Sequence, residues 1–180
     1  MTRFVQRFRA LWKQEHGGAS VEFVLAVPIL MAIFMASFES GLFMTREIML
    51  EQSVDIVMRE LRLGHYPSPV TTDKLKSEIC SRTIVFSDCT ANIMIELQKI
   101  STSAFVLPTA GAECRDLSQP IKPSTALQIG AENELMLVRA CVIVQALFPT
   151  TGIGLNLTRS TNGGGMKILA VSAFANEPNS

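Results

Sequence analysis

The sequence predicts an α+β fold in which one long N-terminal helix leads into a small domain built on an antiparallel sheet. Three observations predict it. Residues 23–38 form an uninterrupted run without a charged side chain. Apolar residues at a spacing of three and four continue beyond this run to residue 61. From residue 65 onward, prolines and polar residues separate apolar segments of strand length. A helix followed by a compact sheet accommodates all three.

The net charge and the fraction of charged residues exclude several classes of function. The 180 residues include 16 Lys and Arg and 16 Asp and Glu, so the formal net charge is zero. Only 18% of the residues are charged, below the roughly 25% of an ordinary soluble domain. This composition argues against a polybasic nucleic-acid-binding protein, an acidic disordered tail and a large multidomain enzyme. The basic residues before the apolar run are Arg3, Arg7, Arg9 and Lys13.

The apolar stretch extends over residues 23–44 if Glu39 is tolerated within it. As a helix it covers about 33 Å, enough to cross a hydrocarbon core of about 30 Å. The basic residues upstream favour a cytoplasmic N-terminus. We therefore expect a single-pass protein of a bacterial inner membrane, with its C-terminal domain in the periplasm. A cleaved secretory signal is disfavoured because Phe38, Glu39 and Phe43 spoil any small-residue cleavage site.

One helix is predicted from about Ser20 to Leu63. Gly64 has the residue type that commonly follows a helix C-terminus. Pro28 is expected to kink the helix, because proline removes one backbone hydrogen bond. Glu39 lies near the predicted outer interface, where we expect it to face water rather than another helix.

Small residues join the basic leader to the apolar helix. Gly17 and Gly18 allow the backbone to be held extended by a protease, which a helix would forbid. Glu22 follows, and a carboxylate at the start of a membrane helix is costly unless it is paired or lies at the interface. Taken alone, Glu22 is either a functional group or a complement to the positive helix N-terminus.

A family resemblance decides between these readings. Gly17, then Glu22 and Phe23, followed by an apolar helix, resemble the processing site of type IV prepilins. Within that group the sequence is similar to the TadE-like minor pseudopilins of the tight-adherence (Flp) pilus system. The segments that carry this similarity are the basic leader, GASVEFVLAVPILM, REIMLEQSVDIVMRELRLG, Ile79-Cys80, Asp88-Cys89, VRACVIVQALFP and AFANEP. The resemblance implies a pilin-like lollipop fold.

The resemblance also implies a processing step and a set of partners. A prepilin peptidase would cut after Gly17, which makes Gly18 the first residue of the mature chain. The Glu22 carboxylate of one subunit would then pair with the Gly18 α-amine of a neighbour and set the axial register of a helix bundle. Pro28 lies in the helix that forms this bundle and is counted with the assembly residues. Implied partners are this peptidase, other pilins or pseudopilins, the pilus assembly platform and membrane lipid. The alternative is an unprocessed, membrane-anchored periplasmic binding or scaffold module of an envelope secretion complex.

The predicted domain organisation has three parts: the leader 1–17, the helix 18–64 and the exported domain 65–180. In the exported domain we expect a helix over residues 72–80, with Thr72 or Asp73 near its N-cap and Leu75 and Ile79 on one face. Strands are predicted at 91–99, 103–107, 135–148 and 167–175, with a long loop at 108–130 and a flexible turn at 162–165. The apolar stripe of the long helix is expected to cover the sheet through Val54, Val57, Met58 and Leu61.

Four cysteines lie after the predicted span: Cys80, Cys89, Cys114 and Cys141. An even number on the exported side favours disulfides, of which three connectivities are possible. We favour Cys80–Cys89 and Cys114–Cys141. No C-x-x-C pair occurs, and the spacings resemble no zinc site, so we expect no metal and no cofactor. His16 and His65 lack partners in the sequence for general-base chemistry, and we expect no catalytic residue and no enzyme activity.

Overall fold

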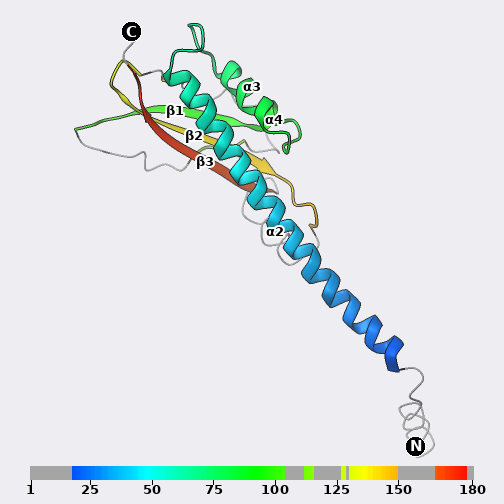
Figure 1. Ribbon diagram of the computed structural model, residues 1–180. Helices are drawn as coiled ribbons and strands as arrows, with labels where there is room; N and C mark the ends of the chain where they lie inside the picture. The colour runs from blue at the N-terminus through cyan, green and yellow to red at the C-terminus, as the bar shows by residue number, and fades with distance from the viewer. Residues whose placement is uncertain (1–17, 104–111, 116–126, 129, 150–164, 178–180) are drawn as a thin grey trace, which may run out of the picture.

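The computed structural model describes residues 18–103, 112–115, 127–128, 130–149 and 165–177 (Figure 1). The predicted α+β fold, with a long N-terminal apolar helix followed by a small antiparallel sheet, is confirmed. Gly17 and the rest of the leader lie outside the described residues. The elements are the helices α2 (Gly18–Arg62), α3 (Thr72–Arg82) and α4 (Cys89–Asn92), and the strands β1 (Met94–Ile100), β2 (Leu135–Val144) and β3 (Met166–Ala175).

The long helix α2 has 45 residues and is therefore about 67 Å long. It continues through Pro28 without interruption. Its end is capped by backbone hydrogen bonds, since Gly64 N donates to Leu61 O and His65 N donates to Glu60 O, both at 3.1 Å. Gly64 has a φ of +70°, a conformation that glycine adopts without the steric penalty of a side chain.

The three strands form one antiparallel sheet in the order β1-β2-β3. Ala140, in the central strand, lies opposite Ile95 in β1 and Ala170 in β3. The C-terminal half of α2 crosses one face of this sheet (Figure 1). Side chains alternate between the two faces of a strand, so the even-numbered residues of β2 face α2.

The core lies between α2 and the sheet. Its buried residues come from the C-terminal part of α2, beginning at Leu50, and from α3, α4 and the three strands. Val54, Val57 and Met58 are buried as predicted, and Leu61 packs at the edge. Leu75 and Ile79 of α3 are also buried, as their spacing indicated. The fully enclosed sheet residues in this core are Ile95, Leu97, Met136, Val138, Ala140, Val142, Ile168 and Ala170.

The opposite face of β2 is buried too, which the alternating pattern alone does not indicate. Arg139 lies on this face, as predicted, but is only 8% exposed. It forms an ion pair with Glu96 of β1, with 2.6 Å between Nη2 and Oε2. The disulfide from Cys141 to Cys114 brings residues 112–115 to the same face, and Lys167 Nζ donates to Ala112 O at 2.9 Å.

Several predicted boundaries are wrong, and local contacts explain the differences. Residues 91 and 92 belong to α4 rather than to a strand, because the Cys80–Cys89 bridge and the left-handed backbone of Asp88 turn the chain there. The N-cap of α3 is Thr71, whose hydroxyl accepts a hydrogen bond from Lys74 N at 3.3 Å. The strand β2 ends at Val144, not at residue 148.

Other predictions lie wholly or partly outside the described residues. Ser103 is in a turn, and residues 104–107 of the predicted strand are not described. Most of the predicted loop 108–130 is not described either, but Leu127 forms a parallel bridge to Leu97. The predicted turn at 162–165 is described only at Gly165, where β3 is about to begin.

The prediction that Glu39 faces water is wrong. Its side chain is 1% exposed. Glu39 Oε1 accepts a hydrogen bond from Leu147 N at 3.0 Å, and Oε2 accepts one from Phe148 N at 2.9 Å. The sequence places these residues more than 100 positions apart, so helix periodicity contains no sign of the contact.

The two disulfides predict a measurable difference in stability. They span separations of 9 and 27 residues, for which the chain-entropy relation gives about 2.6 and about 3.5 kcal/mol. We expect Cys114→Ala/Cys141→Ala to lower the free energy of unfolding more than Cys80→Ala/Cys89→Ala does. Urea unfolding of the full chain in detergent micelles measures both, with the reduced wild-type chain as the control. A larger loss on removal of the shorter bridge would contradict the loop-entropy argument.

Candidate assembly surface

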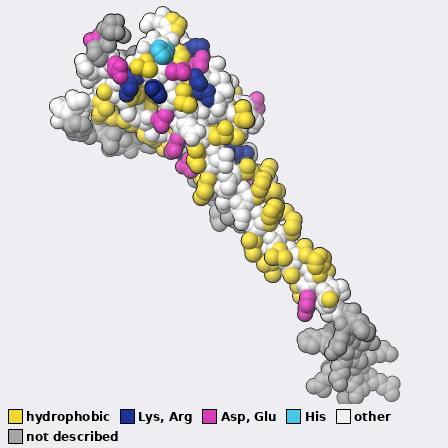
Figure 2. Space-filling model, viewed as in Figure 1, with side chains coloured by type: hydrophobic (Ala, Val, Ile, Leu, Met, Phe, Trp, Pro, Cys, Tyr) yellow, Lys and Arg dark blue, Asp and Glu magenta, His cyan; other side chains and the backbone are white. Residues whose placement is uncertain are grey.

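The N-terminal half of α2 stands clear of the folded domain. None of residues 18–38 is buried, and Glu39 is the first buried residue of the helix. Figure 2 shows hydrophobic side chains covering this half, whereas charged side chains gather on the domain. The helix is long and apolar enough to cross a membrane. The large exposed hydrophobic residues in its N-terminal half are Val21, Phe23, Val24, Leu25, Ile29, Leu30, Met31, Ile33, Phe34 and Phe38.

The predicted processing residues that the structure describes lie together at the start of this surface. Gly18 is the first residue of α2, and a side chain added there would meet no atom within 4 Å. Glu22 is exposed one helical turn later, and Phe23 beside it is 68% exposed. Pro28 is exposed on the same helix. None of these four residues is buried by the described part of the domain after α2, so all four are accessible to another molecule.

Glu39 marks the boundary between the exposed and the packed halves of α2. Each of its carboxylate oxygens accepts one backbone N–H from the segment after β2. Phe148, in that segment, packs edge-on against Phe38, with 6.3 Å between ring centroids. The site therefore has a polar centre with an aromatic contact beside it. Sequence reasoning identified Glu39 as unusual but had no signal for its partner.

A second polar cluster lies at the far end of α2. The Tyr66 hydroxyl donates to Glu60 Oε2, and Arg82 Nη2 lies 3.0 Å from Glu60 Oε1. The hydrogen bond from Tyr66 is the largest cause that lowers the pKa of Glu60, and Arg82 adds to it. Burial raises the pKa of Tyr66 to about 12, and its bond to the Glu60 carboxylate adds to the shift. Sequence analysis missed this cluster because its members come from three separate segments.

This cluster ties the helix end to α3, and Tyr66 also borders a cavity of about 310 Å³. Leu61 and Leu97 line the cavity on the apolar side, and Glu132 and Asn176 line it on the polar side. The cavity is partly open to solvent. In the cluster, both carboxylate oxygens of Glu60 are engaged, one by the Tyr66 hydroxyl and the other by Arg82.

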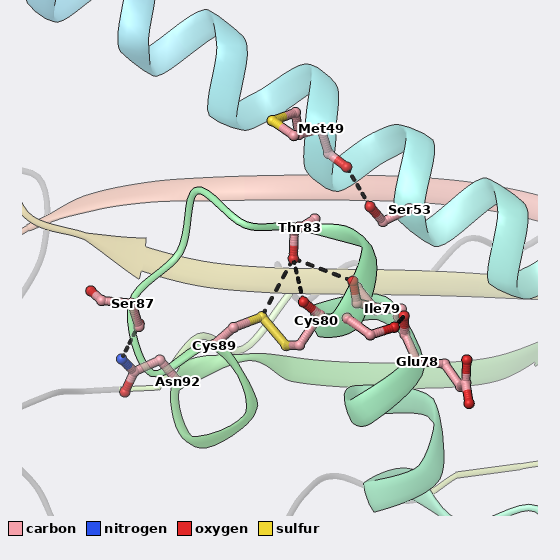
Figure 3. The surroundings of a disulfide bond; sticks show 10 residues. Met49, Ser53, Glu78, Ile79, Cys80, Thr83, Ser87, Cys89 and Asn92 are labelled. Atoms are coloured by element: carbon pink, nitrogen blue, oxygen red, sulfur yellow. Dashed lines mark hydrogen bonds between the residues drawn. A yellow bond between two sulfur atoms is a disulfide. The ribbon is translucent and has the colours of Figure 1, made fainter.

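The cysteines are all in disulfides, in the pairing favoured from the sequence. Figure 3 shows Thr83 beside the Cys80–Cys89 bridge, below Met49 and Ser53 of α2. Thr83 Oγ1 donates to Ile79 O at 3.2 Å and lies 3.7 Å from Cys89 Sγ. Thr83 is 2% exposed, so the bridge closes a packed corner between α3 and α4. Its surroundings are those of a structural disulfide rather than a reactive thiol.

Within the described part of the chain, no three His, Cys, Asp or Glu side chains are grouped so that they could hold a metal ion. His65 is exposed just beyond the end of α2. The described residues form a helix with an exposed apolar N-terminal half, attached to a small domain that contains two disulfides.

Comparison with protein families supports the resemblance seen in the sequence. The model of the family described as TadE-like protein matches residues 17–59, which cover the Gly17/Gly18 junction and most of α2. No curated protein and no solved structure matches the chain. The match indicates a protein associated with the Tad pilus system, and the apolar helix within it is consistent with membrane anchoring.

The Tyr66 cluster predicts a high phenol pKa. Tyr66 is the only tyrosine, so the ultraviolet absorbance of phenolate reports this residue alone. We expect its titration midpoint at about 12 in the folded chain and at about 10 in denaturant. The neutral phenol is favoured by folding, so this contribution to stability is complete below pH of about 10 and is lost as the pH rises through about 12.

Glu60→Gln is the matched variant, because it removes the carboxylate charge but leaves Tyr66 partly buried. We expect its midpoint to lie between the wild-type and the denatured values, since burial is the larger cause of the shift. Circular dichroism at each pH restricts the titration to folded protein. A wild-type midpoint equal to that in denaturant would show that Tyr66 is neither buried nor bonded to Glu60.

Proposed function

Because residues 17–59 of this chain are TadE-like, we propose that it is a minor pseudopilin that takes part in the assembly of a Tad/Flp pilus after processing by a prepilin peptidase. The observation that carries this proposal is the exposed apolar half of α2, which begins at Gly18 and has Glu22 one turn later. The protein would act through helix contacts and would not be an enzyme.

The proposed topology follows from charge and length. The basic leader stays in the cytoplasm by the positive-inside rule, and α2 crosses the inner membrane. The domain after α2 then lies in the periplasm, where its two disulfides are stable. Peptidase cleavage after Gly17 would remove the residues that set this orientation and leave Gly18 with a free α-amine.

That amine explains how processing would license assembly. In lipid, an unpaired carboxylate or ammonium group is strongly unfavourable, so Glu22 of one subunit would favour the Gly18 amine of a neighbour. The two groups are four residues apart along the helix, which corresponds to about 6 Å of rise. Pairing them between subunits would offset adjacent helices by about this distance along the bundle axis. An uncut leader has no such amine.

The division of α2 restricts where neighbouring helices would pack. From Glu39 onward, one face of the helix is covered by the sheet and by the segment after β2. Residues 18–38 have no such cover and extend over about 32 Å. Subunit contacts through the helix would therefore concentrate in this half, with the exported domains arranged outside the bundle. The partners would be other pilins or pseudopilins and the assembly platform.

The first test is the N-terminus of the mature protein. Edman sequencing or intact mass should place Gly18 first in cells that contain the prepilin peptidase and should retain the leader in cells that lack it. Lysine at Gly17 (Gly17→Lys) should block the cut, because a long side chain replaces the smallest residue at the scissile bond. A mature chain that keeps residues 1–17 in peptidase-positive cells would instead favour the unprocessed membrane-anchored scaffold.

The second test separates cleavage from assembly. Glu22→Ala should still be cleaved but should reduce incorporation into pili or pilus complexes about tenfold or more, since the unpaired amine then costs more than about 1.4 kcal/mol. Glu51→Ala removes an exposed carboxylate from the packed half of the same helix and serves as the control. Immunoblots of sheared pili and membranes measure both. Unchanged incorporation of Glu22→Ala would refute the register role.

A further inference from the structure

We propose that the segment immediately after β2, residues 146–149, is inserted into the outer leaflet of the membrane beside α2 and that Glu39 holds it there. The occupant of the apolar surface formed by Phe38, Leu147 and Phe148 is then lipid. This inference requires only that α2 spans a membrane, so it goes beyond the proposed role in pilus assembly.

The position of the contact along α2 is the first argument. Glu39 lies five residues before the outer end of the apolar stretch 23–44, which is about 7.5 Å along the helix axis. Arg46 lies just outside that stretch, and its Nη1 is 3.4 Å from Gln145 O. The chain after β2 therefore descends along α2 from the level of Arg46 to the level of Glu39. Figure 1 shows this segment leaving the sheet and following α2 toward its N-terminal half.

Hydrogen bonding at this depth is the second argument. Leu147 N and Phe148 N belong to a segment that has left the sheet, and both donate to the Glu39 carboxylate. In water such donors need no protein partner, whereas in hydrocarbon an unpaired N–H is strongly unfavourable. The same two bonds satisfy a carboxylate that would otherwise be costly inside the apolar stretch. The contact thus meets two requirements that hydrocarbon imposes at this depth: an acceptor for each backbone donor and a donor for each carboxylate oxygen.

The apolar surface of the segment is the third argument. Leu147 is 52% exposed and Phe38 is 47% exposed. Phe148 packs against Phe38, and Phe38 stacks on Phe34, with 6.3 Å between ring centroids in each pair. The exposed apolar surface of the predicted span therefore continues onto the segment without a polar break. Arg46, with its long side chain at the next level outward, is suited to the phosphate region of the outer leaflet.

Depth-dependent quenching by lipid tests the insertion. Trp12 is the only tryptophan, so Trp12→Phe makes an introduced tryptophan the sole indole. The full chain carrying Phe148→Trp is reconstituted in phosphatidylethanolamine and phosphatidylglycerol vesicles that contain lipid brominated near the glycerol end of its acyl chains. Phe38→Trp is the control within the membrane. Ile84→Trp is the control in water, because Ile84 is 88% exposed on the exported domain.

We expect the brominated lipid to quench Phe148→Trp as strongly as it quenches Phe38→Trp, with blue-shifted emission, and to leave Ile84→Trp unquenched. Water-like emission and no quenching for Phe148→Trp would overturn the proposal. A blue shift that grows with the protein-to-lipid ratio but comes without quenching would also overturn it, because a second copy of the chain would then cover the surface.

The role of Glu39 has its own variant. Adding Glu39→Ala to Phe148→Trp should weaken the quenching, because both backbone donors lose their acceptor, whereas quenching of Phe38→Trp with Glu39→Ala should persist. Glu39→Gln keeps one acceptor oxygen and should restore part of the effect, and Glu51→Ala should leave it unchanged. Circular dichroism confirms that each variant is folded. Equal quenching with and without Glu39→Ala would show that this carboxylate does not hold the segment. Pilus assembly enters none of these readouts, so failure here and failure of the proposed function are distinguishable.

Discussion

The apolar contact between the C-terminal half of α2 and one face of the sheet is the interaction on which the rest of the structure depends. Leu50, Val54, Val57 and Met58 are buried in one core with Ile168 and Ala170 of β3, the strand that α2 contacts, and with the even-numbered residues of β2. The contact attaches a small domain to a helix that continues about 30 Å beyond it. The same helix therefore supplies both the core of the domain and the exposed apolar surface.

The small size of the sheet explains why covalent links accompany this contact. A core built on three strands buries limited apolar area even with α2, α3 and α4 packed on it, and small domains commonly add disulfides. Cys80–Cys89 fixes the corner between α3 and α4 on the side of α2, and Cys114–Cys141 fixes residues 112–115 on the opposite face. The buried pair of Arg139 and Glu96 lies on that second face as well. Both faces of β2 are thus closed by different means.

Glu39 connects α2 to the segment that follows β2. It is the first buried residue of α2, and its partners Leu147 and Phe148 come from the chain that leaves β2. The domain is consequently held to the helix at both ends, by Glu39 near the predicted membrane and by the Glu60, Tyr66 and Arg82 cluster at the far end. Such a two-point attachment suits a subunit whose helix register is expected to matter.

Local patterns in the sequence determined the long helix, the positions of β2 and β3 and the apolar stripe of α2. Hydrophobic periodicity and helix-end signals extend over a few neighbouring residues, so they can be recognised in the sequence before the fold is known. Only the tertiary structure decided the environment of Glu39, the burial of Arg139, the place of Tyr66 and the end of β2 at Val144. Each depends on a partner distant in sequence, and no local pattern specifies which backbone N–H or carboxylate folding brings alongside.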